Sequence, residues 1–362
     1  MKAESFTRIV VDDVSKICAT ETGWDTLREA TVLITGASGM LPMYCTKVLL
    51  GLNDTRDLNI KVKALVRNRK RAEEVFGPDL ERSDFELIVG DVTDPKLDLG
   101  KVDHVIHGAS AARPSEHNRD PVATLRANIA GTDLLLQRHV KAKTPGAFLL
   151  MSSSEVYGSQ DERTTSIGEN SYGGIDLLSP RASYSEGKRA AETLTAVYSH
   201  QYRFAFRNLR FGHIYGPGMR LDDGRVQADF ARDALNGQDI VLLSAGLAMR
   251  TYTYVADAVL GLFMAWLHGK NGAYNVADGG GKVTIRDLAS FFAAAAVPNV
   301  DVAYQDDPSE EGTFNPELVL ALDSTKLMKL GWAPSTGLAR GTARMVAHLR
   351  EVHGRTGTPD ER

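Results

Sequence analysis

The chain has 362 residues, a formal net charge of −4 and 43% hydrophobic residues, which is ordinary for a soluble globular protein. Because no basic excess is available to neutralise a polyphosphate chain, the charge argues against nucleic-acid binding. The two cysteines are too few for a disulfide framework or a metal site. The sequence shows no signal-peptide pattern and no apolar run of roughly 20 residues, so we expect a cytoplasmic protein that does not enter a membrane.

The predicted elements begin with an N-terminal extension, residues 1–30, whose apolar positions are typical of a short helix. From residue 31 short apolar strands alternate with helices, which is the pattern of right-handed βαβ units. The sequence therefore predicts an α/β fold, a Rossmann doubly wound parallel sheet. The predicted strands are 31–35, 61–66, 85–89, 102–107, 147–151 and 206–211, and the predicted helices are 41–52, 121–140 and 184–202.

The alternation loosens after residues 216–218, where the sequence is Gly-Pro-Gly. Two further strands are predicted at 240–243 and 274–276. We expect 31–205 to form the Rossmann domain and 206–350 to form mainly a smaller α/β lobe, with segments that return to the main sheet. The last residues, 351–362, are expected to form a flexible tail.

A glycine-rich turn follows the first predicted strand and opens the first predicted helix. Gly36 and Gly39 let the backbone turn tightly and approach a pyrophosphate, which then lies at the helix N-terminus. Pro42 occupies the third small position of this pattern, and proline is tolerated in a first helical turn. The predicted dinucleotide contacts in this turn are Gly36, Ser38, Gly39, Met40 and Leu41.

Residues at the ends of the next three strands would face the rest of the dinucleotide. An acid after the second strand would bind the ribose 2′-hydroxyl of NAD, but Arg67 stands there, where it would meet the 2′-phosphate of NADP. Both cofactors therefore stay open at this point. The other predicted contacts are Asp91 and Val92 with the adenine, and Gly108, Ala109 and Ser110 with the ribose and pyrophosphate.

A serine cluster and a Tyr-x-x-x-Lys spacing supply a candidate catalytic group. Tyr184 and Lys188 are separated by four residues, which places them one turn apart on one helix face. A free tyrosine with a pKa near ~10 is a poor base at neutral pH, and the lysine ammonium together with the positive nicotinamide ring is expected to lower that pKa. Tyr184 would then take the proton of a sugar hydroxyl as hydride leaves the carbon, with Ser153 holding the same oxygen.

This combination resembles the extended short-chain dehydrogenase/reductase family, in its nucleotide-sugar epimerase/dehydratase branch. The resemblance runs from about residue 31 to about residue 335. The stretches most similar to UDP-glucuronate decarboxylases are SEVYG at 154–158, SPRASY at 179–184, EGKRAAE at 186–192, DGRV at 223–226 and RTYTYV at 250–255.

The resemblance implies roles that spacing alone does not assign. It implies NAD as the cofactor, a UDP-linked nucleotide sugar as the substrate, and a homodimer built on the helices of 121–140 and 184–203. Asn128 matches a residue that organises the site and is counted among the cofactor contacts. The implied catalytic residues are Ser153, Ser154, Glu155, Tyr184, Lys188 and Arg250, and the implied substrate contacts are Arg181, His213, Arg225 and Arg250.

His213 departs from the resemblance, as Pro42 and Arg67 do. The family usually has Asn at this position, next to the sugar diphosphate. A hydrogen-bonded structural histidine fits position 213 at least as well as a catalytic one. The departure leaves the exact sugar open.

Three reactions share this scaffold, and each begins with oxidation of the sugar at C4. A 4,6-dehydratase needs a general acid beside Glu155, where this chain has Ser154, and serine has no useful pKa for that step. A 4-epimerase needs neither Glu155 nor Arg250. A decarboxylase needs only to hold the carboxylate and stabilise an enolate, for which Arg250 supplies charge. The residues therefore favour decarboxylation of UDP-glucuronate to UDP-xylose or its 4-keto form.

The alternatives stay open in a definite order. UDP-sugar 4-epimerisation, of a hexose or a uronate, comes second, and NDP-hexose 4,6-dehydration comes third. An NADP-dependent ketone reductase would consume external NADPH, whereas the other enzymes recycle their bound cofactor. A catalytically silent NAD(P)-sensing protein would bind cofactor without turnover, but such proteins usually lack the Tyr-Lys pair that this chain retains.

Overall fold

The computed structural model describes residues 7–110, 113, 117, 119–141, 146–161, 164–305 and 321–356. Its strands are β1 (Thr31–Thr35), β2 (Lys61–Val66), β3 (Phe85–Val89), β4 (His104–His107), β5 (Ala147–Ser153), β6 (Ala205–Phe211), β7 (His213–Tyr215), β8 (Ile240–Leu242), β9 (Met249–Tyr254), β10 (Gly272–Val276), β11 (Lys282–Thr284) and β12 (Val302–Tyr304). Its α-helices are α1 (Arg8–Ala19), α2 (Met40–Arg56), α3 (Arg69–Phe76), α5 (Pro121–Arg126), α6 (Thr132–Lys141), α7 (Ala182–Tyr202), α8 (Val226–Asn236), α9 (Val255–His268), α10 (Ile285–Ala295), α11 (Thr325–Met328) and α12 (Leu338–Thr356).

A parallel seven-stranded sheet forms the centre of the described part of the chain, with the order β10-β6-β5-β4-β1-β2-β3. Successive side chains of a strand point to opposite faces, and both faces of this sheet are apolar. In β1, Val32 and Ile34 join the core cluster on one face while Leu33 joins the cluster on the other. Strands buried on both faces read as continuous apolar runs, which is why their positions could be predicted.

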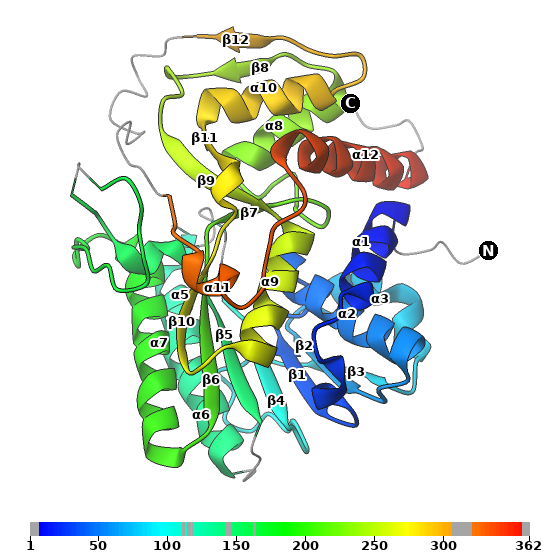
Figure 1. Cartoon of the computed structure of the whole chain (residues 1–362), viewed down its shortest axis with the longest axis vertical. Coiled ribbons are helices and arrows are strands. Elements are labelled where there is room, and N and C mark those ends of the chain that lie inside the picture. The colour runs from blue at the N-terminus through cyan, green and yellow to red at the C-terminus, as the bar shows by residue number, and fades with distance from the viewer. Residues whose placement is uncertain are drawn as a thin grey trace.

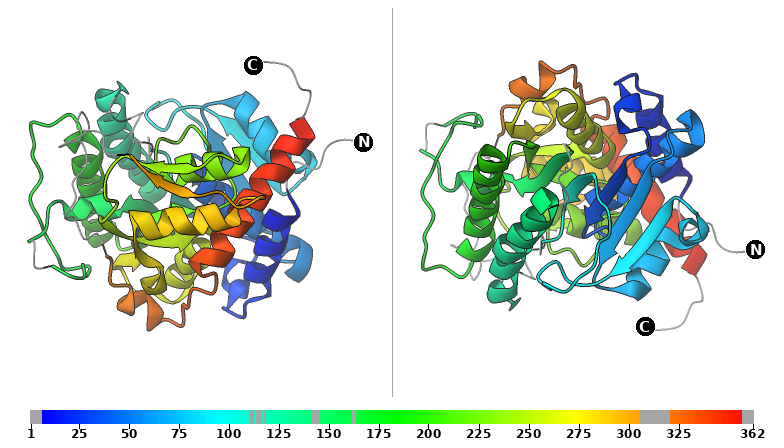
Figure 2. Two further views of the ribbon diagram at one scale, coloured as in Figure 1. Left: turned by 90° about the horizontal axis from the view of Figure 1, so that it is seen from above. Right: turned by 90° about the horizontal axis from the view of Figure 1, so that it is seen from below.

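Helices cover both faces of the sheet (Figures 1 and 2). Helices α2 and α9 pack on one face, and α6 and α7 pack on the other. None of the helices in the described segments is both long and apolar enough to cross a membrane. The two covered faces confirm the predicted doubly wound Rossmann architecture.

A smaller set of elements sits at one end of the sheet (Figure 1). It contains the three-stranded sheet β11-β9-β7 and the two-stranded sheet β12-β8, with α8, α10 and α12 packed against one another. Strands β6 and β10 belong to the main sheet, so parts of 206–350 lie in that sheet. Strands β7 and β9, which the sequence did not predict, pair so that His213 lies beside Tyr252.

The structure shifts several predicted ends by one to four residues. Strand β4 begins at His104 rather than at 102, and β5 continues to Ser153. The helix predicted over 121–140 is interrupted by a π-helical segment, Ala127–Gly131. Helix α12 continues to Thr356, into the segment expected as a tail, and residues 357–362 lie outside the described residues.

The N-terminal extension folds as α1, which packs against α2, α9 and α12. Its buried Asp13 accepts hydrogen bonds from the Tyr44 hydroxyl at 3.1 Å and the Tyr254 hydroxyl at 2.7 Å. Arg344 of α12 donates to the same carboxylate at 2.6 Å. One side chain of the extension therefore joins α2, the end of β9 and the C-terminal helix.

Candidate active site

A cavity of about 1620 Å³ lies over the carboxyl ends of the main-sheet strands and extends to the smaller lobe. In doubly wound sheets this edge is where ligands bind, and the volume exceeds the roughly 300–1,000 Å³ of an ordinary small-molecule pocket. All but one of the residues predicted for the site line this cavity, and the exception is Asn128. The space therefore fits two ligands of nucleotide size side by side.

The glycine turn after β1 forms one wall of the cavity. Gly36 has a φ of 65°, and a Cβ at this position would lie 2.9 Å from the Cα of Ala109, so the turn requires glycine. Helix α2 begins directly after Gly39, and no side chain caps its N-terminal N–H groups. Pro42 lies in the unbroken first turn of α2, so it is a variation that the helix tolerates.

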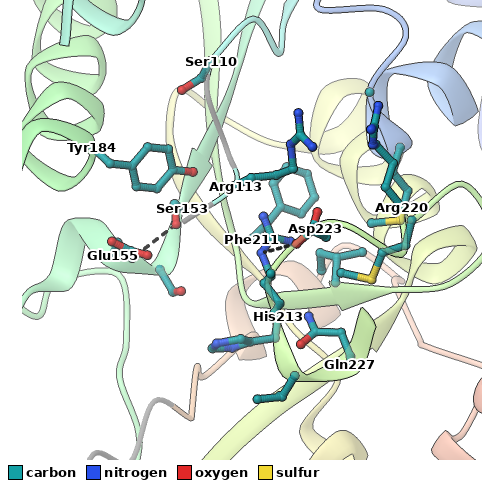
Figure 3. A pocket seen from close by; sticks show the side chains of 18 of the residues that line it. Ser110, Arg113, Ser153, Glu155, Tyr184, Phe211, His213, Arg220, Asp223 and Gln227 are labelled. Carbon is teal, nitrogen blue, oxygen red and sulfur yellow. Dashed lines mark hydrogen bonds and ion pairs between the residues drawn. The ribbon is translucent and has the colours of Figure 1, made fainter. Parts of the chain in front are cut away.

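These features fit the pyrophosphate of a dinucleotide. The uncapped N–H groups of α2 face the cavity and favour an anion. The Ser110 hydroxyl, on the loop after β4, is buried without a hydrogen-bond partner among the described residues and lines the same cavity (Figure 3). A buried polar group of this kind is normally satisfied, so the wall is built for a polar ligand.

The end of the cavity beyond β2 and β3 contains one carboxylate, Asp91. Its oxygen accepts hydrogen bonds from the Thr93 backbone N–H at 2.8 Å and hydroxyl at 2.7 Å. Burial acts to raise the Asp91 pKa, but these bonds and the charge of Arg67 outweigh it and hold the pKa below its usual range. Asp91 is therefore fixed as an ionised acceptor, while Arg67 stands exposed at the end of β2.

The predicted catalytic pair lies on α7 at the centre of the cavity. Tyr184 is 7% exposed and Lys188 3% exposed. The Lys188 Nζ lies 5.8 Å from the centroid of the Tyr184 ring and donates a hydrogen bond to the Met151 carbonyl at 2.7 Å. Burial lowers the pKa of Lys188 to about 8. The one-turn spacing thus places both groups at the end of β5, as predicted.

The sequence predicts a lowered pKa for Tyr184, but the protein groups alone raise this pKa. Burial, and after it the negative charge of Glu155, raise the pKa of Tyr184 to about 12. Ser153 and the charge of Arg225 act in the opposite direction, but their effect is smaller. The Lys188 ammonium is not among the causes of this shift. Lowering of the Tyr184 pKa therefore depends on positive charge brought into the cavity by a ligand, and not on the helix spacing by itself.

Residues after β5 place a carboxylate next to the tyrosine (Figure 3). Ser153 caps a short 3₁₀ turn by accepting the Glu155 N–H at 3.2 Å. The Glu155 carboxylate is exposed to the cavity and accepts a hydrogen bond from the Ser185 hydroxyl at 3.1 Å. Ser154 is buried beside it. Ser185 is a site residue that the sequence reasoning missed, although it directly follows Tyr184.

Asn128 lies behind the cavity and does not line it. Asn128 is in the π-helical segment, and its Nδ2 donates a hydrogen bond to the carbonyl of Thr124 in α5 at 2.9 Å. A Cβ at Gly187 of α7 would lie 3.0 Å from the Asn128 side chain. Asn128 therefore packs against the helix that carries Tyr184, and its role as a cofactor contact stays a prediction.

The smaller lobe contributes positive charge to the opposite wall. Arg250 of β9 and Arg225, at the start of α8, both line the cavity, and Arg225 forms an ion pair with Asp223 at 3.2 Å. Burial, then the charges of Arg250 and Arg225, lower the pKa of His213 to about 3. His213 is therefore neutral at physiological pH, and its ring lies 5.4 Å from that of Tyr252. Arg181, at the start of α7, lines the cavity near Tyr184.

Other residues in the cavity or directly beside it were not identified from the sequence. His117 does not line the cavity, but it stacks on the Tyr184 ring with a centroid distance of 4.3 Å and an interplanar angle of 11°. Gln227 of α8 is fully buried, and neither atom of its amide has a hydrogen-bond partner among the described residues. The arginines Arg71, Arg113 and Arg220 also line the cavity and were not predicted as site residues. No group of three potential metal ligands occurs in the described segments.

Comparison with known proteins agrees with this geometry. A family model described as the NAD dependent epimerase/dehydratase family matches residues 32–277. UDP-glucuronic acid decarboxylase 2 of Arabidopsis thaliana is 32% identical over 88% of this chain and 68% of that protein, and decarboxylase 6 of the same plant is 30% identical over 88% of each. The structure of UDP-glucuronic acid 4-epimerase from Bacillus cereus, in complex with UDP-glucuronic acid and NAD, matches with a TM-score of 0.73 at 21% identity, over 89% of this chain and 99% of that chain.

Proposed function

The chain belongs to the NAD dependent epimerase/dehydratase family, and from this premise we propose that it is an enzyme that oxidises UDP-glucuronate at C4 and then removes its carboxyl group. The observation that carries this proposal is the meeting of three groups in one cavity. Tyr184 and Lys188 form the oxidation site, Glu155 lies beside it, and Arg250 faces it from the lobe. The similar decarboxylases of Arabidopsis thaliana support the same choice.

The cofactor is NAD, which the family description names and which is bound in the Bacillus cereus neighbour. When bound, NAD would supply the redox chemistry, since it can accept a hydride from C4 of the sugar and, once reduced, give a hydride back. The uncapped start of α2 would hold the pyrophosphate, and Asp91 would accept from the adenosine. Lys188, buried at the end of β5, would hold the nicotinamide ribose next to Tyr184.

Tyr184 would act as the general base for the C4 hydroxyl. Ser153 lies close enough to the Tyr184 oxygen to act to lower its pKa, so the serine would help to hold the sugar hydroxyl against the tyrosine. A phenolate is unfavourable while the Tyr184 pKa stays near about 12. Ionisation of Tyr184 is therefore coupled to ligand binding, which delays proton removal until the site is loaded.

Arg250 and Glu155 would act on the C6 end of the sugar. Once C4 is a ketone, the C6 carboxylate is a β-keto acid and loses carbon dioxide readily. The bond from C5 to C6 breaks, its electron pair moves into an enolate, and Arg250 can stabilise that charge. The proton that C5 then gains would come from a water ordered by Glu155, or from Glu155 after it has taken up a proton from solvent. Ser154, between Ser153 and Glu155, offers no acid for dehydration.

Product mass tests the proposal directly. The full chain is incubated with UDP-glucuronate and NAD, and the products are analysed by mass spectrometry. We expect loss of carbon dioxide, with either the pentose or its 4-ketone as the product. An unchanged mass with inverted C4 would establish the epimerase instead, and loss of water from a UDP- or dTDP-hexose would establish the dehydratase.

An exposed apolar face formed by α5, the π-helical segment Ala127–Gly131 and α7 favours a homodimer. Four apolar side chains of this face, Val122, Leu125, Ile129 and Val197, are between 36% and 61% exposed. Leu135 of the predicted stripe is instead buried in the core. An apolar helical face of this kind is stabilised by pairing with its copy. Light scattering at micromolar concentration tests this proposal, and a monomer would refute it.

A further inference from the structure

Two buried polar side chains on the smaller-lobe wall of the cavity have no hydrogen-bond partner among the residues that the structure describes. Gln227, in the first turn of α8, is fully buried, and neither Oε1 nor Nε2 of its amide has a partner in the described segments. Tyr252 of β9 is 1% exposed, and its hydroxyl has no partner there either. Both residues line the cavity. Because buried polar groups are normally satisfied, these two favour a ligand that brings hydrogen-bonding groups of its own.

Two comparable groups away from the cavity are bonded. Asn275 of β10 is also fully buried, but its amide makes three hydrogen bonds, at 2.5, 2.9 and 2.9 Å. Tyr254 lies two residues after Tyr252 on the same strand, and its hydroxyl donates to the Asp13 carboxylate at 2.7 Å. The fold therefore satisfies this amide and this phenol outside the cavity, and it leaves Gln227 and Tyr252 unsatisfied where a ligand could reach them.

The two side chains lie near residues already assigned to the sugar nucleotide. Tyr252 is paired with His213 across β9 and β7, and the centroids of the two rings are 5.4 Å apart. Successive side chains of a strand alternate between its faces, so Tyr252 shares a face of β9 with Arg250. In Figure 3 the Gln227 amide lies in the pocket below Asp223, as the His213 ring does. Both side chains therefore belong to the end of the cavity where the sugar would be bound.

The two groups and their neighbour His213 are polar but carry no charge. Burial raises the pKa of Tyr252, against a smaller opposite effect of the Arg250 charge, so the hydroxyl keeps its proton. His213 is neutral because burial, and then the charges of Arg250 and Arg225, lower its pKa to about 3. A phosphate or carboxylate offers acceptors only and would leave the Gln227 oxygen unsatisfied, whereas a hydroxyl both donates and accepts. Sugar hydroxyls therefore match these groups, while Arg225 and Arg250 match the charged parts of the ligand.

From this geometry we propose that Gln227 and Tyr252 bind hydroxyl groups on the sugar ring of the substrate, and so decide which sugars the cavity accepts. The inference rests on the proposed function in one respect, since it takes the cavity to bind a sugar nucleotide. A site built to hydrogen-bond a hydroxyl rejects an analogue that lacks it, because the buried groups of the site then stay unpaired. A ligand without the sugar ring should therefore gain nothing from either side chain.

The test is equilibrium binding by calorimetry on the full chain loaded with NAD, with UDP-glucose compared with UDP. UDP-glucose carries the ring hydroxyls but no carboxylate that decarboxylation could remove. Gln227→Leu should weaken UDP-glucose binding by about 5- to 50-fold, the size of one or two hydrogen bonds, and UDP binding by less than about threefold. Tyr252→Phe should weaken UDP-glucose binding by about 3- to 10-fold, again with little effect on UDP.

Two controls change matching groups that do not line the cavity. Gln238→Leu replaces an exposed amide just after α8, and Tyr215→Phe removes a buried hydroxyl of β7 that also has no hydrogen-bond partner in the described part of the chain. Neither should change the affinity for UDP-glucose. The thermal midpoint Tm, measured without sugar nucleotide, tests for a structural role. Gln227→Leu replaces an unpaired buried amide with an apolar side chain of similar size, so Tm should stay the same or rise.

The outcomes separate this inference from the proposed reaction. Unchanged UDP-glucose binding in both variants would overturn the inference. Equal weakening of UDP would overturn it too, since the contacts would then lie on the uridine diphosphate, whose uracil ring also donates and accepts. A lowered Tm with an unchanged ratio of the two affinities would assign both side chains to the fold alone. If wild type bound UDP-glucose through these side chains but released no carbon dioxide from UDP-glucuronate, this inference would be supported and the proposed reaction refuted.

Discussion

The two halves of the cavity are positioned by different means. The dinucleotide half consists of loops at the carboxyl ends of β1, β2 and β4, which are neighbours in one parallel sheet. Its contacts depend on backbone geometry, as at Gly36 with its positive φ. The sugar half depends on side chains that distant segments bring together. His213 of β7 and Arg250 of β9 lie in a separate three-stranded sheet.

This difference indicates which half of the cavity allows more choice of residue. A turn that needs glycine and an uncapped helix start leaves little choice of residue, so the dinucleotide half is constrained by the fold itself. The side chains of the sugar half can change without altering the strands that carry them. We therefore expect the chemistry of this chain to depend mainly on residues such as Glu155 and Arg250, which both line the cavity.

Tyr184→Phe should have the largest effect, because Tyr184 stands where the two halves meet. The variant removes one hydroxyl from a buried ring and little packing, so it should fold and bind dinucleotide. Loss of the general base should lower kcat by about 10²- to 10⁴-fold. Steady-state turnover of UDP-glucuronate measures this. Tyr198→Phe, on the same helix but bonded to Asp133 at 2.6 Å outside the cavity, should keep its activity. Near-wild-type activity in Tyr184→Phe would mean that the catalytic group has been misassigned.

Asp13→Ala tests the connection between the halves, since Asp13 joins α2, β9 and α12. The substitution leaves two tyrosine hydroxyls and the Arg344 guanidinium without their shared acceptor, which should lower the free energy of unfolding by about 3–5 kcal/mol. Asp12→Ala is the matched control, because Asp12 is half-exposed while pairing with Lys16 and Arg344, and it should cost less than about 1 kcal/mol. Urea unfolding measures both. If both variants lost the same free energy of unfolding, the Asp13 hydrogen bonds would stabilise the fold no more than the ion pairs of Asp12 do.

The sequence predicted the dinucleotide half better than the sugar half, for physical reasons. The Gly36 turn and the Tyr184–Lys188 pair follow from local spacing, and the structure places both at the cavity. Strands β7 and β9 are short, and their pairing brings His213 beside Tyr252, which no local pattern encodes. The raised pKa of Tyr184 also escaped prediction, because it results from burial and from the position of Glu155. Both depend on the folded chain.

Arg250→Ala tests whether the sugar half decides the reaction. The charge of Arg250 should matter most as the enolate develops, so kcat should fall by about 10- to 100-fold, the size of a charged hydrogen bond, and KM should change less. Arg286→Ala is a suitable control because Arg286 is exposed on α10 and does not line the cavity. A rise in KM with unchanged kcat would instead make Arg250 a simple binding residue.

His213→Asn should have the smallest effect and concerns the position where this chain departs from the family's usual residue. Burial and the charges of Arg250 and Arg225 lower the His213 pKa to about 3. A lowered pKa means that the ring gains its proton only near pH 3, so between pH 5 and 8 it stays a neutral hydrogen-bonding group. An asparagine amide has the same charge, and kcat/KM should therefore change by less than about threefold, the range of a substitution that disturbs no network. The pH profile of kcat/KM from 5 to 8 should be the same in both enzymes, because this parameter reports the groups of the free enzyme. A step near pH 6.5 that is present in wild type and absent from His213→Asn would show that His213 titrates in the free enzyme, and would assign it an ionic role at the sugar half of the cavity.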